Sequence, residues 1–214
     1  MDYYRKADWD LFAAKLNLSY ETEKAGTFSF GYDFSHTTGT DYIQYVRALS
    51  NGSTSNTEMK NSLYLSYDYT WNNLSLGAGL RYEHIRSDLK ENSSNKNQNQ
   101  TYHNFLPSVS LSYNIESLQQ SLTYSVHTER PPFGVMNDNA VYTDRFTYQK
   151  GNLYLKQALT HDLNYMLFYK FLFFNLNYTH TQNPLITAFY SMPGNSAVTV
   201  SYICLLYTSP SPRD

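Results

Sequence analysis

The residues best suited to acid–base chemistry are His127, Glu129 and Arg130, which lie together at the end of one alternating segment. General acid–base catalysis needs a nucleophile or metal partner in defined geometry, and no such partner is evident in the sequence. The remaining candidates are scattered histidines, and no pair among them has the spacing of a zinc site. These are His84, His103, His161 and His180. The sequence therefore predicts no catalytic residue, no metal site, no cofactor and no enzymatic activity.

Four further charged residues, Asp33, Asp68, Arg81 and Glu83, lie inside alternating segments and fall on their polar side. We expect all four to face a water-filled lumen. One interpretation is an electrostatic lining that guides a solute or holds a plug. The other is a set of structural ion pairs between adjacent strands. Such pairs contribute little stability, and the sequence favours this second interpretation.

A long segment of irregular pattern, residues 131–160, carries aromatic and charged side chains together. Long loops on a rigid scaffold are where binding usually resides. We therefore predict a ligand-binding loop that would hold a sugar or a siderophore, and a packed loop that only shields a barrel mouth remains the alternative. The candidate ligand-binding residues are Tyr142, Asp144, Arg145, Tyr148 and Lys150.

The elements that position these residues follow from a period-two pattern. Along residues 27–34 every second residue is a large aromatic, and the residues between are small or polar. The pattern returns in residues 61–69, 74–82, 108–115, 121–126 and 175–178. Successive side chains of a strand point to opposite faces, so each segment sorts apolar and polar residues onto two surfaces. Repeated strand after strand, this is what a barrel in lipid around a wet lumen requires.

Composition agrees with strands. The 214 residues are 17% aromatic and only 16% charged, and Asn, Ser, Thr and Tyr supply the polarity. The net charge of −2 leaves no basic footprint for nucleic acid, and one cysteine excludes a disulfide framework. No apolar run is long enough for a membrane-spanning helix. The first residues show no signal-peptide pattern and resemble the interior of a longer protein.

We expect long strands at residues 9–21, 27–49 with a break near Gly39, 58–69, 74–90, 102–115, 120–130, 162–169 and 173–182, and a weaker one at 185–190. The connections alternate between short turns and long loops, and the loops at 50–57, 91–100 and 131–160 are expected outside the cell. The fold class is thus all-β, an antiparallel up-and-down transmembrane β-barrel. An odd strand count without a closing partner indicates an incomplete barrel of about eight to ten strands.

Several phrases resemble a known family. They are Gly-Leu-Arg-Tyr-Glu at 79–83, Leu-Pro-Ser-Val-Ser-Leu-Ser-Tyr at 106–113, Arg-Pro-Pro-Phe at 130–133 and Tyr-Gln-Lys-Gly-Asn-Leu-Tyr-Leu-Lys at 148–156. Their order resembles the outer-membrane β-barrel family of Bacteroidetes-type bacteria, related to TonB-dependent receptors. In its Gly-Asn-Pro-x-Leu-Lys-Pro-Glu motif, Gly151, Asn152, Leu155 and Lys156 match, whereas Leu153, Gln157 and Ala158 depart. The Asn-Pro-Leu-Ile phrase at 183–186 resembles the family's strand exit.

The resemblance implies a bacterial outer-membrane protein, part of a receptor that takes up a siderophore or a glycan. Its partners would be outer-membrane lipid, a small-molecule or glycan ligand, and a plug domain and TonB through upstream sequence. The barrel domain is expected to cover residues 1–203. Residues 204–214, including Cys204, resemble sequencing-adapter read-through and form a non-native tail.

Two other functions remain open at this point. A barrel without transport would act as an adhesin or an assembly scaffold. A soluble β-sandwich would bind carbohydrate through exposed Tyr and Trp, and it would bury the aromatic faces between two sheets.

Overall fold

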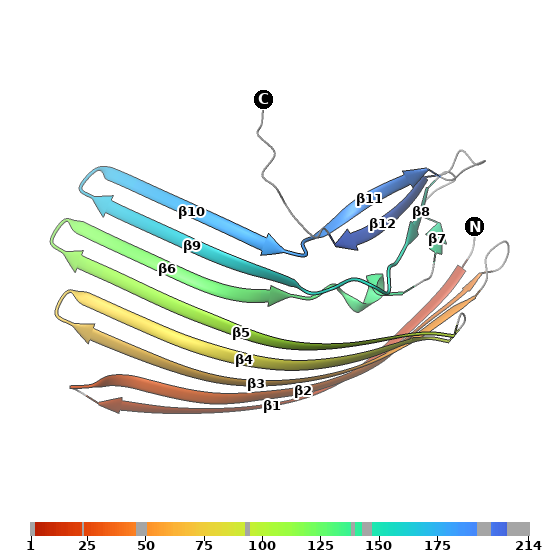
Figure 1. Cartoon of the computed structure of the whole chain (residues 1–214), viewed down its shortest axis with the longest axis horizontal. Helices are drawn as coiled ribbons and strands as arrows, with labels where there is room; N and C mark the ends of the chain where they lie inside the picture. The colour runs from red at the N-terminus through yellow and green to blue at the C-terminus, as the bar shows by residue number, and fades with distance from the viewer. Residues whose placement is uncertain are drawn as a thin grey trace.

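The computed structural model describes residues 3–22, 24–45, 51–92, 95–137, 140–142, 147–191 and 198–204, with backbone alone at 140–142. Its main element is a curved antiparallel sheet of eight strands (Figure 1). In spatial order the strands are β1 (Tyr3–Thr22), β2 (Gly26–Tyr45), β3 (Gly52–Trp71), β4 (Leu74–Glu91), β5 (Lys96–Ile115), β6 (Leu118–Glu129), β9 (Ala158–Tyr169) and β10 (Leu172–Gln182). No helix in the described ranges has the length and apolarity to cross a membrane.

A second sheet of four short strands lies beside the main one (Figure 1). Its order is β11 (Leu185–Ser191), β12 (Val198–Cys204), β8 (Thr147–Lys150) and β7 (Ala140–Tyr142). Strand β12 runs parallel to β8, and the other pairs are antiparallel. The β6–β9 connection, residues 130–157, contributes β7, β8 and the 3₁₀ turn η1 (Phe133–Val135). This sheet therefore joins the connection to the β11–β12 hairpin.

Tight turns close four hairpins at one end of the main sheet, here called the turn end; the opposite end is the loop end. Asn72, Glu116 and Lys170 each begin such a turn with φ of 46–52°, a left-handed conformation that reverses the chain within two residues. Successive turns are staggered: Leu74, the first residue of β4, pairs with Tyr113, and β5 continues beyond it to Ile115. Such stagger is the shear by which a sheet curls into a barrel.

One face of the main sheet, the outer face, is apolar. The alternate residues that form it lie within 12–20, 28–36, 59–71, 74–84, 103–115, 118–126, 161–169 and 172–180. None of these outer residues is Asp, Glu, Lys or Arg. Leu18, Phe30, Leu65 and Leu80 form one cross-strand row, and Leu65 is 59% exposed. These side chains do not converge on a dry interior, as a β-sandwich would require, and they need a surrounding apolar phase.

Aromatic and histidine side chains border this apolar band. At the turn end, the rings of Phe28 and Tyr67 lie 4.6 Å apart. At the loop end, the hydroxyls of Tyr82 and Tyr124 lie 2.8 and 2.9 Å from Nδ1 of His103 and His161. Beyond this row charges return to the outer face as the ion pairs Lys6–Asp8 and Arg86–Asp88. The band thus has the two amphipathic borders typical of a membrane-spanning wall.

The prediction of long antiparallel strands is confirmed, but several predicted boundaries are wrong. Residues 52–57 belong to β3 and residues 96–100 to β5, so both predicted loops are shorter. Strand β2 passes Gly39 without a break. This position is glycine because the Trp9 ring occupies the space where a Cβ would stand. Beyond the band both faces contact water, so the two-residue alternation fades while the hydrogen-bond ladder continues.

The C-terminal half also differs from the prediction. The predicted irregular segment 131–160 contains η1, β7 and β8, and β9 already begins at Ala158. The predicted strand at 185–190 is β11, which belongs to the second sheet. Its partner β12 was not predicted, and β12 ends at Cys204, which pairs in register with Leu185.

Candidate functional site: the inner face and the connection that covers it

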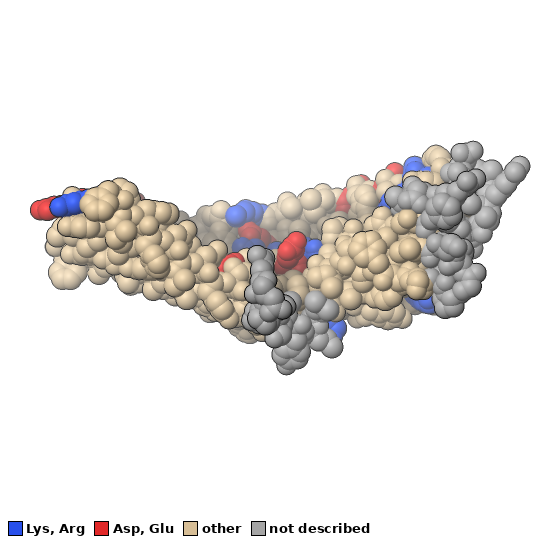
Figure 2. All heavy atoms as spheres, turned by 90° about the horizontal axis from the view of Figure 1, so that it is seen from above, with Lys and Arg blue, Asp and Glu red and all other residues tan. Residues whose placement is uncertain are grey.

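The opposite, inner face of the main sheet carries a cluster of interlocked charges. Arg81 on β4 donates from Nη2 to Asp33 Oδ2 on β2 at 2.7 Å and from Nε to Glu83 Oε1 at 2.9 Å. The Lys60 ammonium on β3 lies 2.8 Å from the same Glu83 oxygen. Figure 2 shows such charges gathered in the hollow at the middle of the molecule, beside broad uncharged surfaces. The inner face of the sheet is therefore polar and charged, whereas the outer face is apolar.

A tyrosine supports the cluster. Tyr64 on β3 lies across Gly31 of β2, and any Cβ at Gly31 would overlap its ring. The Arg81 guanidinium is 5.6 Å from the centroid of that ring, within the range of a cation–π contact. Beside it a hollow of about 270 Å³ is lined by Lys15, Asp33, Lys60 and Arg81, among others.

The structure brings three of the four predicted lumen residues together. Asp33, Arg81 and Glu83 form the cluster, whereas Asp68 is exposed nearer the turn end, where it pairs in register with Thr27. The Lys60–Glu83 pair joins adjacent strands, as the favoured interpretation of the sequence expected, whereas the Arg81–Asp33 pair spans β3 and the Arg81–Glu83 pair lies within β4. Their position on an inner face beside a hollow leaves the solute-guiding role as a proposal.

The side chains that could have formed a metal or catalytic centre lie in ion pairs and ring stacks. His127 Nδ1 lies 3.3 Å from Asp162 Oδ2, a pair that joins β6 to β9. Arg130, the first residue of the β6–β9 connection, contacts Glu58 of β3. His84 stacks on His103 on the outer face, with ring centroids 4.8 Å apart. Within the described ranges no three metal-ligating side chains come together.

The β6–β9 connection folds back over the loop-end half of the inner face and packs there. Leu89 of β4 and Met136, Leu153 and Leu155 of the connection form a buried apolar cluster, and Leu155 is fully buried. Phe133 of η1 stacks on Trp9 of β1 with ring centroids 5.1 Å apart. The connection is therefore attached to both β1 and β4, which lie on different parts of the wall.

The Gly-Asn phrase of the connection has a structural explanation. A Cβ on Gly151 would lie 2.5 Å from the Asn137 carbonyl oxygen and 2.8 Å from that of Val135, so only glycine fits. Asn152 accepts from the Tyr154 backbone N–H at 2.9 Å and donates from Nδ2 to the Tyr202 carbonyl of β12 at 3.1 Å. The matched residues Gly151, Asn152 and Leu155 thus hold the connection to η1, β12 and the apolar cluster.

Polar contacts complete the attachment to β5. Gln100 Nε2 donates to the Leu155 carbonyl at 3.0 Å, and Gln157 Nε2 donates to Asn104 Oδ1 at 2.6 Å. The Tyr102 hydroxyl donates to Gln100 at 2.5 Å, and burial raises the pKa of this phenol above its ordinary value. At the rim, hydrogen bonding to Asp41 raises the pKa of Arg5. The Tyr102 phenol and the Arg5 guanidinium thus both act as hydrogen-bond donors in these contacts.

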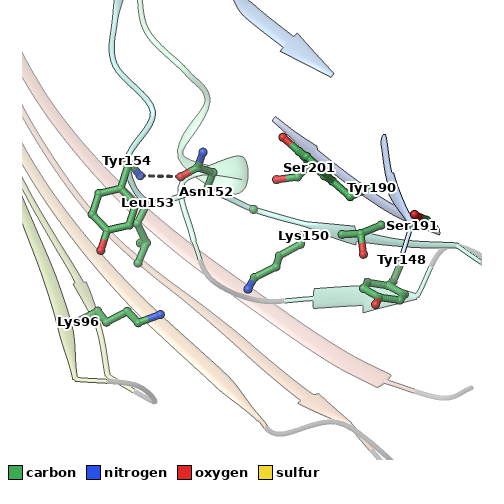
Figure 3. Close-up of a pocket in the computed structure, with 11 residues that line it drawn as sticks. Lys96, Tyr148, Lys150, Asn152, Leu153, Tyr154, Tyr190, Ser191 and Ser201 are labelled. Carbon is green, nitrogen blue, oxygen red and sulfur yellow. Dashed lines mark hydrogen bonds between the residues drawn. The ribbon is translucent and has the colours of Figure 1, made fainter. Parts of the chain in front are cut away.

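A pocket of about 410 Å³ opens between the connection, the start of β5 and the second sheet (Figure 3). Of the predicted ligand-binding residues, Tyr148 and Lys150 line it. Tyr142 pairs in register with Tyr148, but its side chain, like Asp144 and Arg145, lies outside the described residues. The sequence analysis missed Lys96, Tyr190, Ser191, Thr199 and Ser201, which also line the pocket.

Comparison with known families decides what kind of wall this is. Residues 2–203 match the model of the family described as "Outer membrane protein beta-barrel family". The chain belongs to this family. The comparison with curated proteins returned no match.

Family membership gives physical meaning to the two faces of this outer-membrane β-barrel protein. It resides in the bacterial outer membrane, where the uncharged outer band contacts hydrocarbon and the charged inner face contacts water. Family membership excludes the third hypothesis from the sequence, a soluble carbohydrate-binding β-sandwich. An open edge at β1 or β10 cannot be left unpaired in lipid, so further strands must complete the wall.

Proposed function

We propose that this chain is part of the transport barrel of a TonB-dependent receptor that takes up a nutrient such as a siderophore or a glycan. The observation that carries the proposal is the β6–β9 connection, which is fixed against the inner face and lines a pocket with its outer portion. A barrel that served only as a wall would not need a packed segment inside its mouth. The ordered phrases that resemble the TonB-related family support the same function.

In this proposal each part has a physical role. The outer band holds the barrel in lipid, and the connection captures the ligand. The inner-face charges around Arg81 guide the solute or contact a plug domain. A plug and TonB, reached through other parts of the longer protein, would supply energy from the inner membrane. No covalent step is involved, and no residue is assigned to catalysis.

The test is energy-dependent uptake by cells that produce the complete protein. We expect uptake of at least one member of a panel of ferric siderophores and oligosaccharides, and we expect a protonophore to abolish it. The double variant Leu153→Ser/Leu155→Ser should reduce uptake severalfold by releasing the connection, and the outer-face control Lys6→Gln should not. Equal uptake with and without the protonophore would contradict the proposal. Loss of surface attachment without any uptake defect in a deletion strain would instead favour an adhesin or a scaffold.

A further inference from the structure

A further hollow lies on the outer face of the main sheet, beyond the aromatic and histidine border at the loop end. Its volume is about 420 Å³, and every residue that lines it is polar or charged. The lining residues occupy alternate positions of three adjacent strands, so all of them lie on the face opposite the lumen. They are Ser55 and Thr57 on β3, Arg86, Asp88 and Lys90 on β4, and Asn97 and Asn99 on β5.

Strand register places this hollow at the level of the lipid headgroups. At the border of the apolar band Tyr82 pairs with Phe105, and their rings lie 5.0 Å apart. His84 and His103 form the next outer row, and Arg86 is the next outer residue of β4. At about 3.3 Å per residue, the hollow begins roughly 7 Å beyond these histidines. Aromatic borders mark the boundary between hydrocarbon and headgroups, so the hollow adjoins the headgroup layer.

Two cations line the hollow with donors to spare. Arg86 donates from Nε to Asp88 Oδ2 at 3.2 Å, and its two terminal nitrogens have no partner among the described residues. Lys90 is exposed and has no ion pair or hydrogen bond with any residue that the structure describes. Asp88 offsets one of the two positive charges, so the hollow keeps a net positive charge. Phosphate suits this set, because guanidinium and ammonium groups both form strong charge-assisted hydrogen bonds with its oxygens.

The uncharged lining groups suit a sugar that carries the phosphate. Ser55 and Thr57 offer hydroxyls that both donate and accept, and the amides of Asn97 and Asn99 offer donors and acceptors side by side. Sugar hydroxyls need both kinds of partner. The volume of about 420 Å³ lies within the roughly 300–1,000 Å³ of small-ligand pockets. The hollow is therefore large enough for a phosphorylated hexosamine.

We infer that this hollow binds the phosphorylated sugar headgroup of an outer-leaflet glycolipid, with the phosphate held by Arg86 and Lys90 and the acyl chains along the apolar band. Outer-membrane barrels direct short turns to the periplasm and longer loops outward, so the loop end lies at the outer leaflet. The main glycolipid of that leaflet carries phosphate on its sugars. The hollow continues directly into the lipid-facing band, which favours a lipid over a soluble sugar phosphate. The inference depends on residence in the outer membrane and not on transport.

The test is native mass spectrometry of the complete protein, released from detergent micelles that contain increasing amounts of lipid A. The probes are lipid A with two phosphates and the same lipid with both phosphates removed. We expect the phosphorylated lipid to bind at least about tenfold more tightly, in keeping with the strength of charge-assisted hydrogen bonds. Equal affinity for the two lipids, or no binding of either, would overturn the inference.

A variant and a matched control assign the effect to this hollow. The double variant Arg86→Gln/Lys90→Gln should weaken binding of the phosphorylated lipid at least about tenfold and leave the dephosphorylated lipid unchanged. Lys6→Gln should change neither, because Lys6 is an outer-face cation beyond the same border that pairs with Asp8 and lies outside the hollow. All three lysine and arginine side chains are exposed, so both variants should fold, which the heat-resistant mobility of the barrel checks. Equal losses in variant and control would overturn the assignment of this site.

A soluble probe distinguishes a lipid from a free sugar phosphate. Glucosamine 1-phosphate offers the same phosphate on the same sugar without acyl chains. We expect it to bind at least about tenfold more weakly than lipid A, because it places no methylene groups on the apolar band. If the soluble phosphate binds as tightly as lipid A, the lipid assignment is wrong.

Discussion

The turn-end and loop-end halves of the same sheet have different inner faces. In the turn-end half the inner residues are small and polar, as in Ser66, Gly77 and Ser110, and they face the interior of the proposed barrel. In the loop-end half Ile43 and Ile85 are each only 1% exposed, and Leu89 packs under the β6–β9 connection. A single set of strands therefore has a wet interior at one end and a small dry core at the other.

The difference between the two halves shows where a membrane barrel can form a hydrophobic core. The outer apolar residues are satisfied by lipid and need no partner in the chain. A core forms only where the chain supplies a segment to cover the inner face. The connection and the wall should therefore respond to different substitutions, and the following predictions separate them.

The largest effect is expected from Leu155→Ala, at the centre of the dry core. Truncating a fully buried leucine typically costs about 2–5 kcal/mol. We expect this cost to weaken attachment of the connection and to leave the stability of the wall unchanged. Limited proteolysis in detergent should cut within residues 131–157 while the wall stays folded. The control Lys156→Ala removes an exposed neighbouring side chain and should leave cleavage unchanged. Cleavage throughout the barrel would show that core and wall are one unit.

The next effect is expected from Leu122→Arg on the outer face of β6. An arginine near the bilayer midplane of a barrel costs about 2–4 kcal/mol. Thr123→Arg, one residue later on the inner face, should cost much less, because its guanidinium reaches water. Unfolding of the complete protein from lipid vesicles in denaturant measures both. Similar costs for the two variants would contradict the assignment of faces.

A smaller effect is expected from Gly151→Ala. The added Cβ would lie 2.5 Å from a backbone oxygen, and overpacking of this kind costs about 1–3 kcal/mol. Hydrogen exchange in residues 133–156 should accelerate, while exchange in β3 and β4 stays as it is in the parent protein. Unchanged exchange in the connection would mean that Asn137 moves aside freely.

The smallest effect is expected from Lys15→Gln in the ion cluster. Its ammonium is 3.9 Å from Asp33, and its side chain is 60% exposed, so the pair should contribute less than about 1 kcal/mol. Lys60→Gln should cost more, because Glu83 is 4% exposed and loses a partner at 2.8 Å. Denaturant midpoints of the two variants check this order, and the reverse order would contradict the description of the cluster.

The wall could be predicted from the sequence because lipid and water impose opposite polarity on alternate residues. Thus the alternating Phe28, Phe30 and Tyr32 are enough to predict strand β2. The phrases that resemble the family are enough to predict a barrel. The strand ends could not be predicted. Where both faces contact water, as in the stretch from Lys96 to Gln100, polar residues fill every position and resemble a loop.

The site was only partly predictable for a related reason. Tyr148 and Lys150 stood out because aromatic and charged residues gather in a long segment. Lys96, Thr199 and Ser201 come from elements far apart in the sequence, and only the parallel pairing of β12 with β8 brings two of them beside Lys150. Parallel pairing between remote short strands leaves no periodic signal. The same holds for Leu155, whose burial depends on Leu89 of a different strand.

The most direct test of the two-faced wall is spin labelling of single cysteines at residues 109–112 on β5, in the complete protein carrying Cys204→Ala. We expect collision with oxygen, which concentrates in lipid, to be highest at Val109 and Leu111. Collision with a water-soluble nickel chelate should be highest at Ser110 and Ser112. Labels at 109 and 111 that neither reagent reaches would mean that these side chains lie in a dry protein interior, which would contradict the account.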